Sequence, residues 1–284
     1  MMTRLTSDDI SNVPDGGSEL DSRLVSVTGR TVREIALEAA GLPEGTDLSG
    51  FKVGVVPVTS GLGVIGGFAE SVDAIVRRLG MQSHVTSSTD VAGFAEAVAS
   101  GVDIVMMADD NQFVAYNTRT NTFTDNAYGT AMGYSVALRD AAGGLEGKDV
   151  LVVGSGFVGS DAARILKSMG ASVTVTDIVG EKAMALGRDA CVSASADVLG
   201  QISSHTLILN ASPGEIPGRA VAEGSVISSP GVPYSFDSVA LERARAIIHD
   251  PLEIGAAVMA VCAARDSIKK VSWGLSVSST CIKA

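Results

Sequence analysis

The stretch Asp149-Val150-Leu151-Val152-Val153-Gly154-Ser155-Gly156-Phe157-Val158-Gly159 joins an apolar run to three glycines spaced G-x-G-x-x-G. The apolar run predicts a buried strand, and the residues from about 160 to 169 predict a helix directly after the turn. In this position the first glycine allows a tight turn, the second lets the backbone approach a pyrophosphate, and the third permits close packing of helix on strand. The stretch therefore predicts a dinucleotide-binding unit with the phosphates at the helix N-terminus.

The residues after this unit indicate which dinucleotide is bound. Asp177 ends the next predicted strand, 18 positions after Gly159, where its carboxylate can accept hydrogen bonds from the adenosine ribose hydroxyls. No arginine follows within residues 178–180, so NAD is predicted in preference to NADP. The alternative is an ordinary glycine-rich turn with a capping aspartate. Two more loops follow predicted strands at the same edge, and the expected cofactor contacts are Gly154, Ser155, Gly156, Phe157, Val158, Gly159, Asp177, Ile178, Ala211, Ser212, Pro213 and Pro230.

Alternating strands and helices extend this unit in both directions and predict an α/β protein. Residues 1–48 predict an N-terminal helical segment, and 49–147 a small α/β unit. Residues 148–260 are the predicted Rossmann-type, parallel-sheet dinucleotide-binding domain, which begins after the glycine-rich linker 143–148. Residues 261–284 are a C-terminal extension, either a docking helix or a frayed end. The elements expected in the small unit are strands at 53–58, 83–86 and 103–107, helices at 68–79 and 91–99, a loop over 111–129 and a helix over 130–142.

Composition narrows the class of protein. The 284 residues are 46% hydrophobic and 19% charged, which suits buried parallel strands covered by helices. A net charge of -11 argues against nucleic acid as a partner and is compatible with a cationic small molecule. No apolar run is long enough to cross a membrane and no signal peptide is visible, so a cytoplasmic location is expected. The cysteines at 191, 262 and 281 form no metal or disulfide pattern, and a homodimer is compatible with the sequence.

Candidate substrate residues follow predicted strands outside the glycine-rich unit. Thr59 and Ser60 could hold a substrate carboxylate, although the same residues suit an ordinary β-α turn. Asp109 and Asp110 come directly after an apolar strand and could bind an ammonium, or could cap the next helix. His249-Asp250-Pro251 ends another strand-like run and could supply a proton acceptor, but a lone histidine there is more often structural. No G-x-S-x-G elbow supports hydrolysis by a catalytic triad.

These residues together resemble the pyrrolysine synthase family, which completes pyrrolysine biosynthesis. The resemblance covers about residues 5–260, and its motifs outside the glycine-rich turn are more specific than G-x-G-x-x-G. The matching stretches keep their order and spacing, and they are Leu5-Thr6-Ser7-Asp8-Asp9-Ile10, residues 53–61 with Gly63, Met107-Ala108-Asp109-Asp110, residues 149–154 with Gly156, Val158 and Gly159, and Ser229-Pro230-Gly231-Val232-Pro233.

The resemblance implies an NAD-dependent oxidoreductase acting on a CH-NH2 group. Its substrate would be the isopeptide L-lysine-Nε-3-methyl-D-ornithine, whose ornithine-derived amine is oxidised to an imine or semialdehyde. That product then cyclises to pyrrolysine with loss of ammonia and water. Such chemistry requires a proton acceptor, because only a neutral amine can release hydride, and carboxylates that hold the remaining ammonium.

The resemblance also implies roles for particular residues. Asp109 and Asp110 would hold the charged end of the substrate, and Thr59 and Ser60 would line its pocket. The helix that starts near Leu5 would close over the substrate and exclude water. The acidic residue of the family's Glu-Pro-Leu-Gly-Ile-Gly segment matches Asp250, the expected catalytic acid or base, in Asp250-Pro251-Leu252-Glu253-Ile254-Gly255. Here the carboxylate is one methylene shorter, and Glu253 replaces a glycine and is the alternative acid.

Two other functions remain open from the sequence. Another two-unit NAD(P) dehydrogenase, of the methylene-tetrahydrofolate or shikimate kind, shares the architecture but is expected to offer a lysine near residues 59–61, where this chain has none. A non-catalytic NAD-sensing module would share the dinucleotide-binding domain alone. Hydride transfer from the isopeptide distinguishes the leading hypothesis from both.

Overall fold

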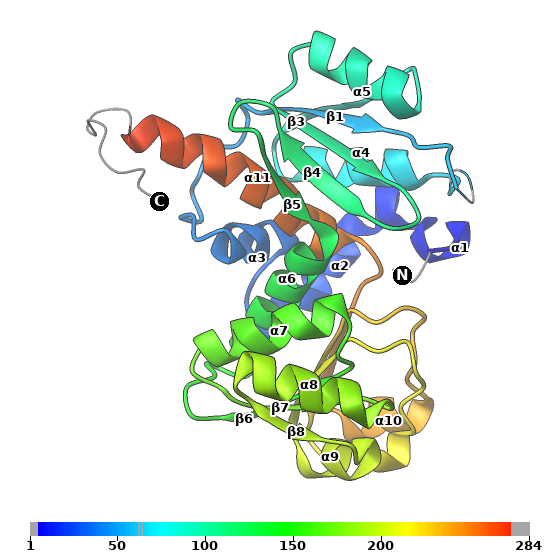
Figure 1. Ribbon diagram of the computed structural model, residues 1–284, viewed down its shortest axis with the longest axis vertical. Helices are drawn as coiled ribbons and strands as arrows, with labels where there is room; N and C mark the ends of the chain where they lie inside the picture. The colour runs from blue at the N-terminus through cyan, green and yellow to red at the C-terminus, as the bar shows by residue number, and fades with distance from the viewer. Residues whose placement is uncertain (1–4, 62, 64, 274–284) are drawn as a thin grey trace.

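Two sheets, each flanked by helices, make up the two halves of the molecule, one above the other in Figure 1. The fold is given by a computed structural model that describes residues 5–61, 63 and 65–273. Residues 274–284 of the expected C-terminal extension, with Cys281, lie outside the described residues. In the described part of the chain, no helix is long and apolar enough to cross a membrane.

The first sheet has the strand order β2-β1-β3-β4-β5, in which β1, β2 and β3 are parallel and β4 and β5 are antiparallel additions. The prediction of a loop over 111–129 is wrong, because this region contains β4, β5 and the first turn of a helix. In β4 every second residue is buried, but the buried set includes the polar Asn117, the alternate positions include the apolar Val114, and the run is short. The elements are β1 Lys52–Val56, α4 Phe68–Arg78, β2 Gln82–Val85, α5 Asp90–Ala99, β3 Ile104–Ala108, β4 Phe113–Asn117 and β5 Thr122–Asp125.

The second sheet has six parallel strands in the order β8-β7-β6-β9-β10-β11. This order places the reversal of winding between β6 and β9, where doubly wound sheets bind dinucleotides. The expected α/β class with a Rossmann-type sheet is confirmed. The elements are β6 Asp149–Val153, α7 Phe157–Ser168, β7 Ser172–Thr176, α8 Gly180–Ala190, β8 Ser193–Ser195, α9 Val198–Ser204, β9 Leu207–Asn210, the 3-10 turn Gly218–Ala220, β10 Val226–Ser229, α10 Ser238–Arg243 and β11 Ala246–His249.

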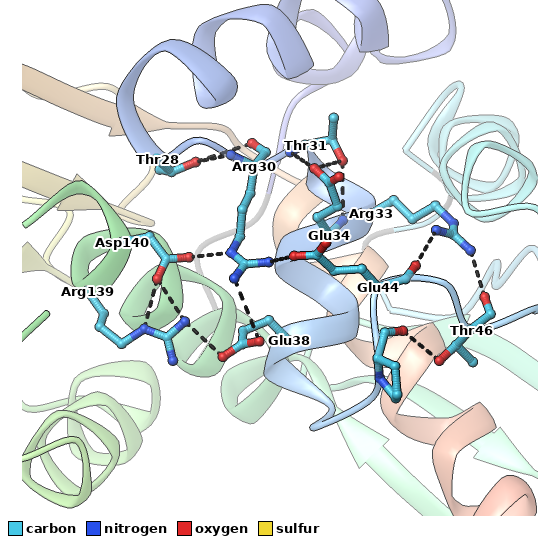
Figure 2. Close-up of polar contacts among 11 residues, drawn as sticks. Thr28, Arg30, Thr31, Arg33, Glu34, Glu38, Glu44, Thr46, Arg139 and Asp140 are labelled. Atoms are coloured by element: carbon cyan, nitrogen blue, oxygen red, sulfur yellow. Dashed lines mark hydrogen bonds and ion pairs between the residues drawn. The ribbon is translucent and has the colours of Figure 1, made fainter. Parts of the chain in front are cut away.

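The N-terminal segment forms α1 (Ser7–Ile10), α2 (Val13–Thr28) and α3 (Val32–Ala39). The side chain of Thr31 caps the start of α3 through a reciprocal capping box with Glu34. Figure 2 shows how the segment joins the helix between the two sheets: Arg30 donates to Asp140 at 2.9 Å and also pairs with Glu38 and Glu44. The N-terminal segment is therefore held against the middle of the molecule.

Two helices connect the halves. The helix α6 (Asn126–Ala141) packs against α11 (Glu253–Trp273), and a Cβ on Gly129 or Gly133 would lie 2.6 Å from a side-chain carbon of α11. From the second sheet α11 returns to the first half and packs on α3, α4 and β4 (Figure 1). Asn117 of β4 donates to the Ala263 carbonyl at 2.8 Å. The boundary placed at residue 260 thus falls inside one continuous helix that packs on the first unit.

Candidate active site

A cavity of about 600 Å³ is lined by the carboxyl ends of strands from both sheets. Its cofactor half, as we call it, is lined by the turns after β6, β7, β9 and β10. Its substrate half is lined by the loop after β1, the turn after β3, the start of α6 and the segment before α11. One continuous space therefore connects the glycine-rich turn with the carboxylates of the first unit.

The three glycines of the turn have different surroundings. Gly154 has φ +94°, and a Cβ there would lie 2.9 Å from the Ala211 carbonyl oxygen. A Cβ on Gly159 would collide with the Gly154 carbonyl oxygen, so this glycine is required by the fold. Gly156 lines the cavity, and a Cβ there would meet nothing within 4 Å. Only the middle glycine leaves open space, and it is at the N-terminus of α7, where a phosphate fits.

Asp177 organises the rim of the cofactor half after β7. Its Oδ2 accepts hydrogen bonds from Ser155 N at 2.8 Å and Ser155 Oγ at 2.7 Å, and its Oδ1 accepts from Val179 N at 2.8 Å. Burial opposes ionisation, but these hydrogen bonds outweigh it and lower the pKa of Asp177. The apolar side chains of Ile178 and Phe157, 92% and 72% exposed, stand at the same rim and line the cavity. These residues fit a dinucleotide, with a carboxylate for ribose hydroxyls and apolar surface for a base.

Asn210 holds together the two remaining loops of the cofactor half. It is fully buried at the end of β9, and its Oδ1 accepts from Ser212 Oγ at 2.8 Å. Its Nδ2 donates to Ser229 Oγ at 3.2 Å. The loops so fixed contribute further lining residues, and these are Ala211, Ser212, Pro213 and Pro230.

Thr59 and Ser60 have different positions, although they are adjacent in the loop after β1. Ser60 lines the cavity, whereas Thr59 is not among its lining residues. Asp90 holds Thr59 by accepting from its N at 2.7 Å and its Oγ1 at 2.5 Å. The Asp90 backbone has φ +55°, a strained conformation for a residue with a side chain, and its N donates to the Pro57 carbonyl at 2.9 Å. Asp90 therefore fixes this loop at the mouth of the substrate half.

Asp109 and Asp110 both line the cavity. The Oδ1 of Asp109 accepts from Asn111 N at 2.7 Å and Gln112 N at 2.8 Å, so it shapes the β3–β4 turn. Its Oδ2 accepts no hydrogen bond from the described residues. The carboxylate of Asp110 lies against the backbone of Gly61, which joins the loops after β1 and β3. Leu5, at the N-terminal side of α1, lines the cavity near them.

Asp250 is buried, lines the cavity and lies in the segment before α11. Its Oδ1 accepts from the backbone N of Leu252 at 2.9 Å, of Glu253, and of Ile254 at 3.3 Å. Burial raises the pKa of Asp250 despite these hydrogen bonds. Among the described residues no group donates to its Oδ2. One oxygen therefore caps the helix, and the other is available to a ligand.

Glu253, the alternative acid, is buried but does not line the cavity. Its carboxylate forms an ion pair with Arg78 of α4. Burial and the nearby Asp250 raise the pKa of Glu253 to about 7, although Arg78 opposes the shift. Of the two candidate acids, Asp250 is the one in contact with the cavity.

Several lining residues lack a motif that could have identified them. Asn126, Thr130 and Tyr134 come from one face of α6, at helical spacing, in a region interpreted partly as loop. Tyr134 donates to the Asp250 carbonyl at 2.5 Å and accepts from its N at 2.9 Å, so it fixes the segment before α11. The apolar wall includes the edge-to-face rings of Phe68 and Phe113, 5.3 Å apart. The only sequence signal for the lining residues of α6 is the helical spacing of small and polar residues.

Comparisons with known proteins indicate the family of the chain. A family model described as pyrrolysine biosynthesis protein PylD, N-terminal domain, matches residues 9–124, and one described as alanine dehydrogenase/PNT, C-terminal domain, matches residues 126–207. Two proteins named pyrrolysine synthase, from Methanosarcina acetivorans and Methanosarcina barkeri, are each 34% identical to the chain, over 262 and 269 residues. Each match covers 91% of this chain, and they cover 98% and 97% of the relatives.

Solved structures resemble the chain in fold. Shikimate 5-dehydrogenase from Thermus thermophilus, in complex with NADP(H) and shikimate, aligns with a TM-score of 0.52 at 14% identity, over 78% of this chain and 99% of that one. Quinate dehydrogenase from Corynebacterium glutamicum, in complex with NAD, aligns with a TM-score of 0.50 at 14% identity, again over 78% and 99%. At this identity the likeness concerns architecture alone.

Proposed function

The chain belongs to the pyrrolysine synthase family, and we propose that it is an NAD-dependent oxidoreductase that oxidises the ornithine-derived amine of L-lysine-Nε-3-methyl-D-ornithine. The continuous cavity is the main support for this proposal, because it joins a dinucleotide-type turn to a buried carboxylate at Asp250. Oxidation of an amine requires both in one space, with the cofactor next to a proton acceptor.

The proposed reaction consists of the loss of a proton, the loss of a hydride and the closure of a ring. The ammonium loses a proton, and the neutral CH-NH2 group then loses a hydride to NAD and becomes an iminium. Attack by the other ornithine-derived amine on that carbon closes the five-membered ring and releases ammonia. By the semialdehyde route, water is taken up when the imine hydrolyses and is returned when the ring closes.

NAD, when bound, supplies the hydride acceptor. The phosphates would lie at Gly156 and the N-terminus of α7, the adenosine ribose at Asp177, and the base against Ile178. The carboxylate of Asp177 favours ribose hydroxyls over a 2′-phosphate, which its charge would repel. This supports NAD over NADP.

Asp250 would take the proton from the substrate ammonium. Burial raises its pKa, which makes the carboxylate a stronger base than one in water. Its Oδ1 is occupied by the α11 amides, so Oδ2 would contact the amine. Tyr134 would hold the backbone of this residue in place.

The other charged end of the substrate would be held by Asp109 and Asp110, beside Ser60. The apolar wall formed by Phe68 and Phe113 suits the aliphatic chain between the two ends of the isopeptide. The segment carrying Leu5 and α1 would close over the cavity, because Leu5 already forms part of its lining. Closure excludes water from the reactive imine.

The competing dehydrogenase hypothesis receives no support from the lining of the cavity. A methylene-tetrahydrofolate or shikimate type of enzyme was expected to place a lysine near the first rim. Among the described residues that line the cavity there is no lysine. The acidic lining instead suits a substrate that carries ammonium groups.

The proposal is tested by incubating the protein with NAD and the synthetic isopeptide. The expected result is a rise in NADH absorbance with a product lighter than the substrate by ammonia and two hydrogens. Lysine and unmodified ornithine serve as control substrates. Failure to form NADH, with NAD binding intact in a separate titration, would favour a non-catalytic NAD-sensing module.

A further inference from the structure

The ion pair between Arg78 and Glu253 lies directly behind Asp250, outside the cavity. Glu253 is in the first turn of α11, with its side chain 5% exposed, and Arg78 is at the end of α4, with its side chain 33% exposed. The Arg78 side chain also packs on Gly17 of α2, so closely that a Cβ on Gly17 would collide with the guanidinium. The pair thus connects three helices around the start of α11.

A chain of hydrogen bonds connects this pair with the proton acceptor. The backbone N of Glu253 donates to Asp250 Oδ1, together with those of Leu252 and Ile254. Any rotation of the first turn of α11 therefore moves the carboxylate of Asp250. Because Glu253 anchors that turn to α4, the ion pair limits such rotation.

The pair is difficult to explain by stability alone. Burial and the neighbouring Asp250 both oppose ionisation of Glu253, and its pKa is about 7. Buried ion pairs are often replaced by apolar residues without loss of stability. The ionised Glu253 carboxylate lowers the stability of the folded protein. Its presence is therefore more readily explained by an effect on the candidate active site.

We propose that Arg78 and Glu253 are positioning residues that orient Asp250 by fixing the first turn of α11 against α4. This rests on the proposed function only for the role of Asp250 in turnover. The link from Glu253 to the backbone amides that donate hydrogen bonds to Asp250 does not depend on the proposed function.

The pair also makes the site sensitive to pH. The charged and titratable groups that face Glu253 are Arg78 on α4, Asp21 on α2, Tyr134 on α6 and Asp250 itself. Tyr134 is kept neutral by burial, which raises its pKa well above the ordinary value. Arg78 is the attractive partner, and the carboxylates oppose the charge. Above about pH 7 the ionised Glu253 pairs with Arg78, and below it the protonated side chain releases the first turn of α11.

The test compares Glu253→Gln, Arg78→Met and Arg78→Lys with the wild-type protein. Arg77→Met is the matched control, because Arg77 forms an exposed ion pair with Asp73 on the same helix at 2.7 Å. Glu253→Gln and Arg78→Met should lower kcat about tenfold, with the affinity for NAD unchanged. Arg78→Lys retains the charge and should recover most of the loss. The rise of kcat through pH 7 should disappear in Glu253→Gln.

Amide hydrogen exchange in the cofactor-free protein gives a second measurement, independent of turnover. Exchange at Leu252 and Ile254 should be several-fold faster in Glu253→Gln and Arg78→Met than in Arg77→Met. If the wild-type protein forms no NADH, this exchange still decides the positioning role. Exchange equal to the control, or wild-type kcat and pH profile in folded Glu253→Gln, would overturn the inference.

Discussion

The two halves of the cavity are built in different ways. The cofactor half is organised around backbone turns: the glycine turn after β6, the N-terminus of α7, and loops that Asn210 fixes. The substrate half is formed by side chains from the segment before α1, the loops after β1 and β3, α6 and the segment before α11. Backbone groups at a rigid turn can bind any molecule with a pyrophosphate, whereas assembled carboxylates and rings select one substrate. Substitutions should therefore affect the two halves in different ways.

The largest effect is expected for Asp250→Asn in the substrate half. The side-chain oxygen of asparagine can still accept from the α11 amides, so the fold is retained while the basic carboxylate is lost. We expect kcat to fall on the order of 10³-fold, the scale of general-base catalysis. Steady-state kinetics with the isopeptide measures the loss, and calorimetry should show unchanged affinity for NAD. A kcat within twofold of wild type would place the proton acceptor elsewhere.

The second effect concerns the pH dependence of stability. Glu253 has an ordinary pKa of 4.5 and a pKa of about 7 in the folded protein, so the folded state binds more protons between these values. Stability from this group is complete below pH 4.5 and is lost as pH rises through 7. At about 1.4 kcal/mol per pKa unit, the loss is on the order of 3 kcal/mol. Urea unfolding at several pH values should show this decline in the wild-type protein.

The matched variant isolates that contribution. In Glu253→Gln the free energy of unfolding should change less between pH 4.5 and 7 than in the wild-type protein, although Asp250 still titrates. Parallel pH profiles of stability for the two proteins would show that ionisation of Glu253 does not lower the free energy of unfolding.

In the cofactor half, two glycines should separate folding from binding. Gly159→Ala places a Cβ against the Gly154 carbonyl oxygen and should destabilise the protein by about 2 kcal/mol. Gly156→Ala meets no protein atom within 4 Å, so its stability should stay close to wild type. We expect its Kd for NAD to rise about tenfold, an effect of about 1.4 kcal/mol. Unchanged NAD affinity in Gly156→Ala would show that the phosphates bind elsewhere.

The smallest effect is expected for Asp90→Ala at the mouth of the substrate half. The hydrogen bonds that Asp90 accepts from the hydroxyl and then the backbone N of Thr59 lower the pKa of Asp90. They also hold the loop that carries Ser60. Without them, KM for the isopeptide should rise several-fold, while kcat and NAD affinity change little. Asp90→Asn keeps one acceptor and should have an intermediate KM. A change in NAD affinity instead would mean that this loop serves the cofactor half.

The same difference explains what the sequence could predict. Gly154, Gly156 and Asp177 belong to one strand-turn-helix-strand unit, so local spacing was sufficient to place them. Thr59 shows the limit of such spacing, since its side chain is held by Asp90, distant in the sequence, rather than lining the cavity. In the same way Ser155 and Gly159 support the turn and do not line the cavity.

The substrate half depends on packing between distant segments. Asn126 and Thr130 reach the cavity because α6 runs between the two sheets, and no sequence motif indicates that path. The sequence left open whether the residues after 260 form a docking helix or a frayed end, because Asn117 and Ala263 meet only in the folded chain. The role expected for Leu5 came from a family resemblance, whereas Asp109 and Asp110 were also indicated by their place directly after an apolar strand.

We propose above that hydride passes from the ornithine-derived amine carbon to NAD in the shared cavity. The most direct test is to place two deuterium atoms on that carbon of the isopeptide and to analyse both products by mass spectrometry. We expect reduced cofactor that is heavier by one mass unit and a pyrrolysine product that retains one deuterium. Unlabelled NADH formed from the labelled substrate would contradict it.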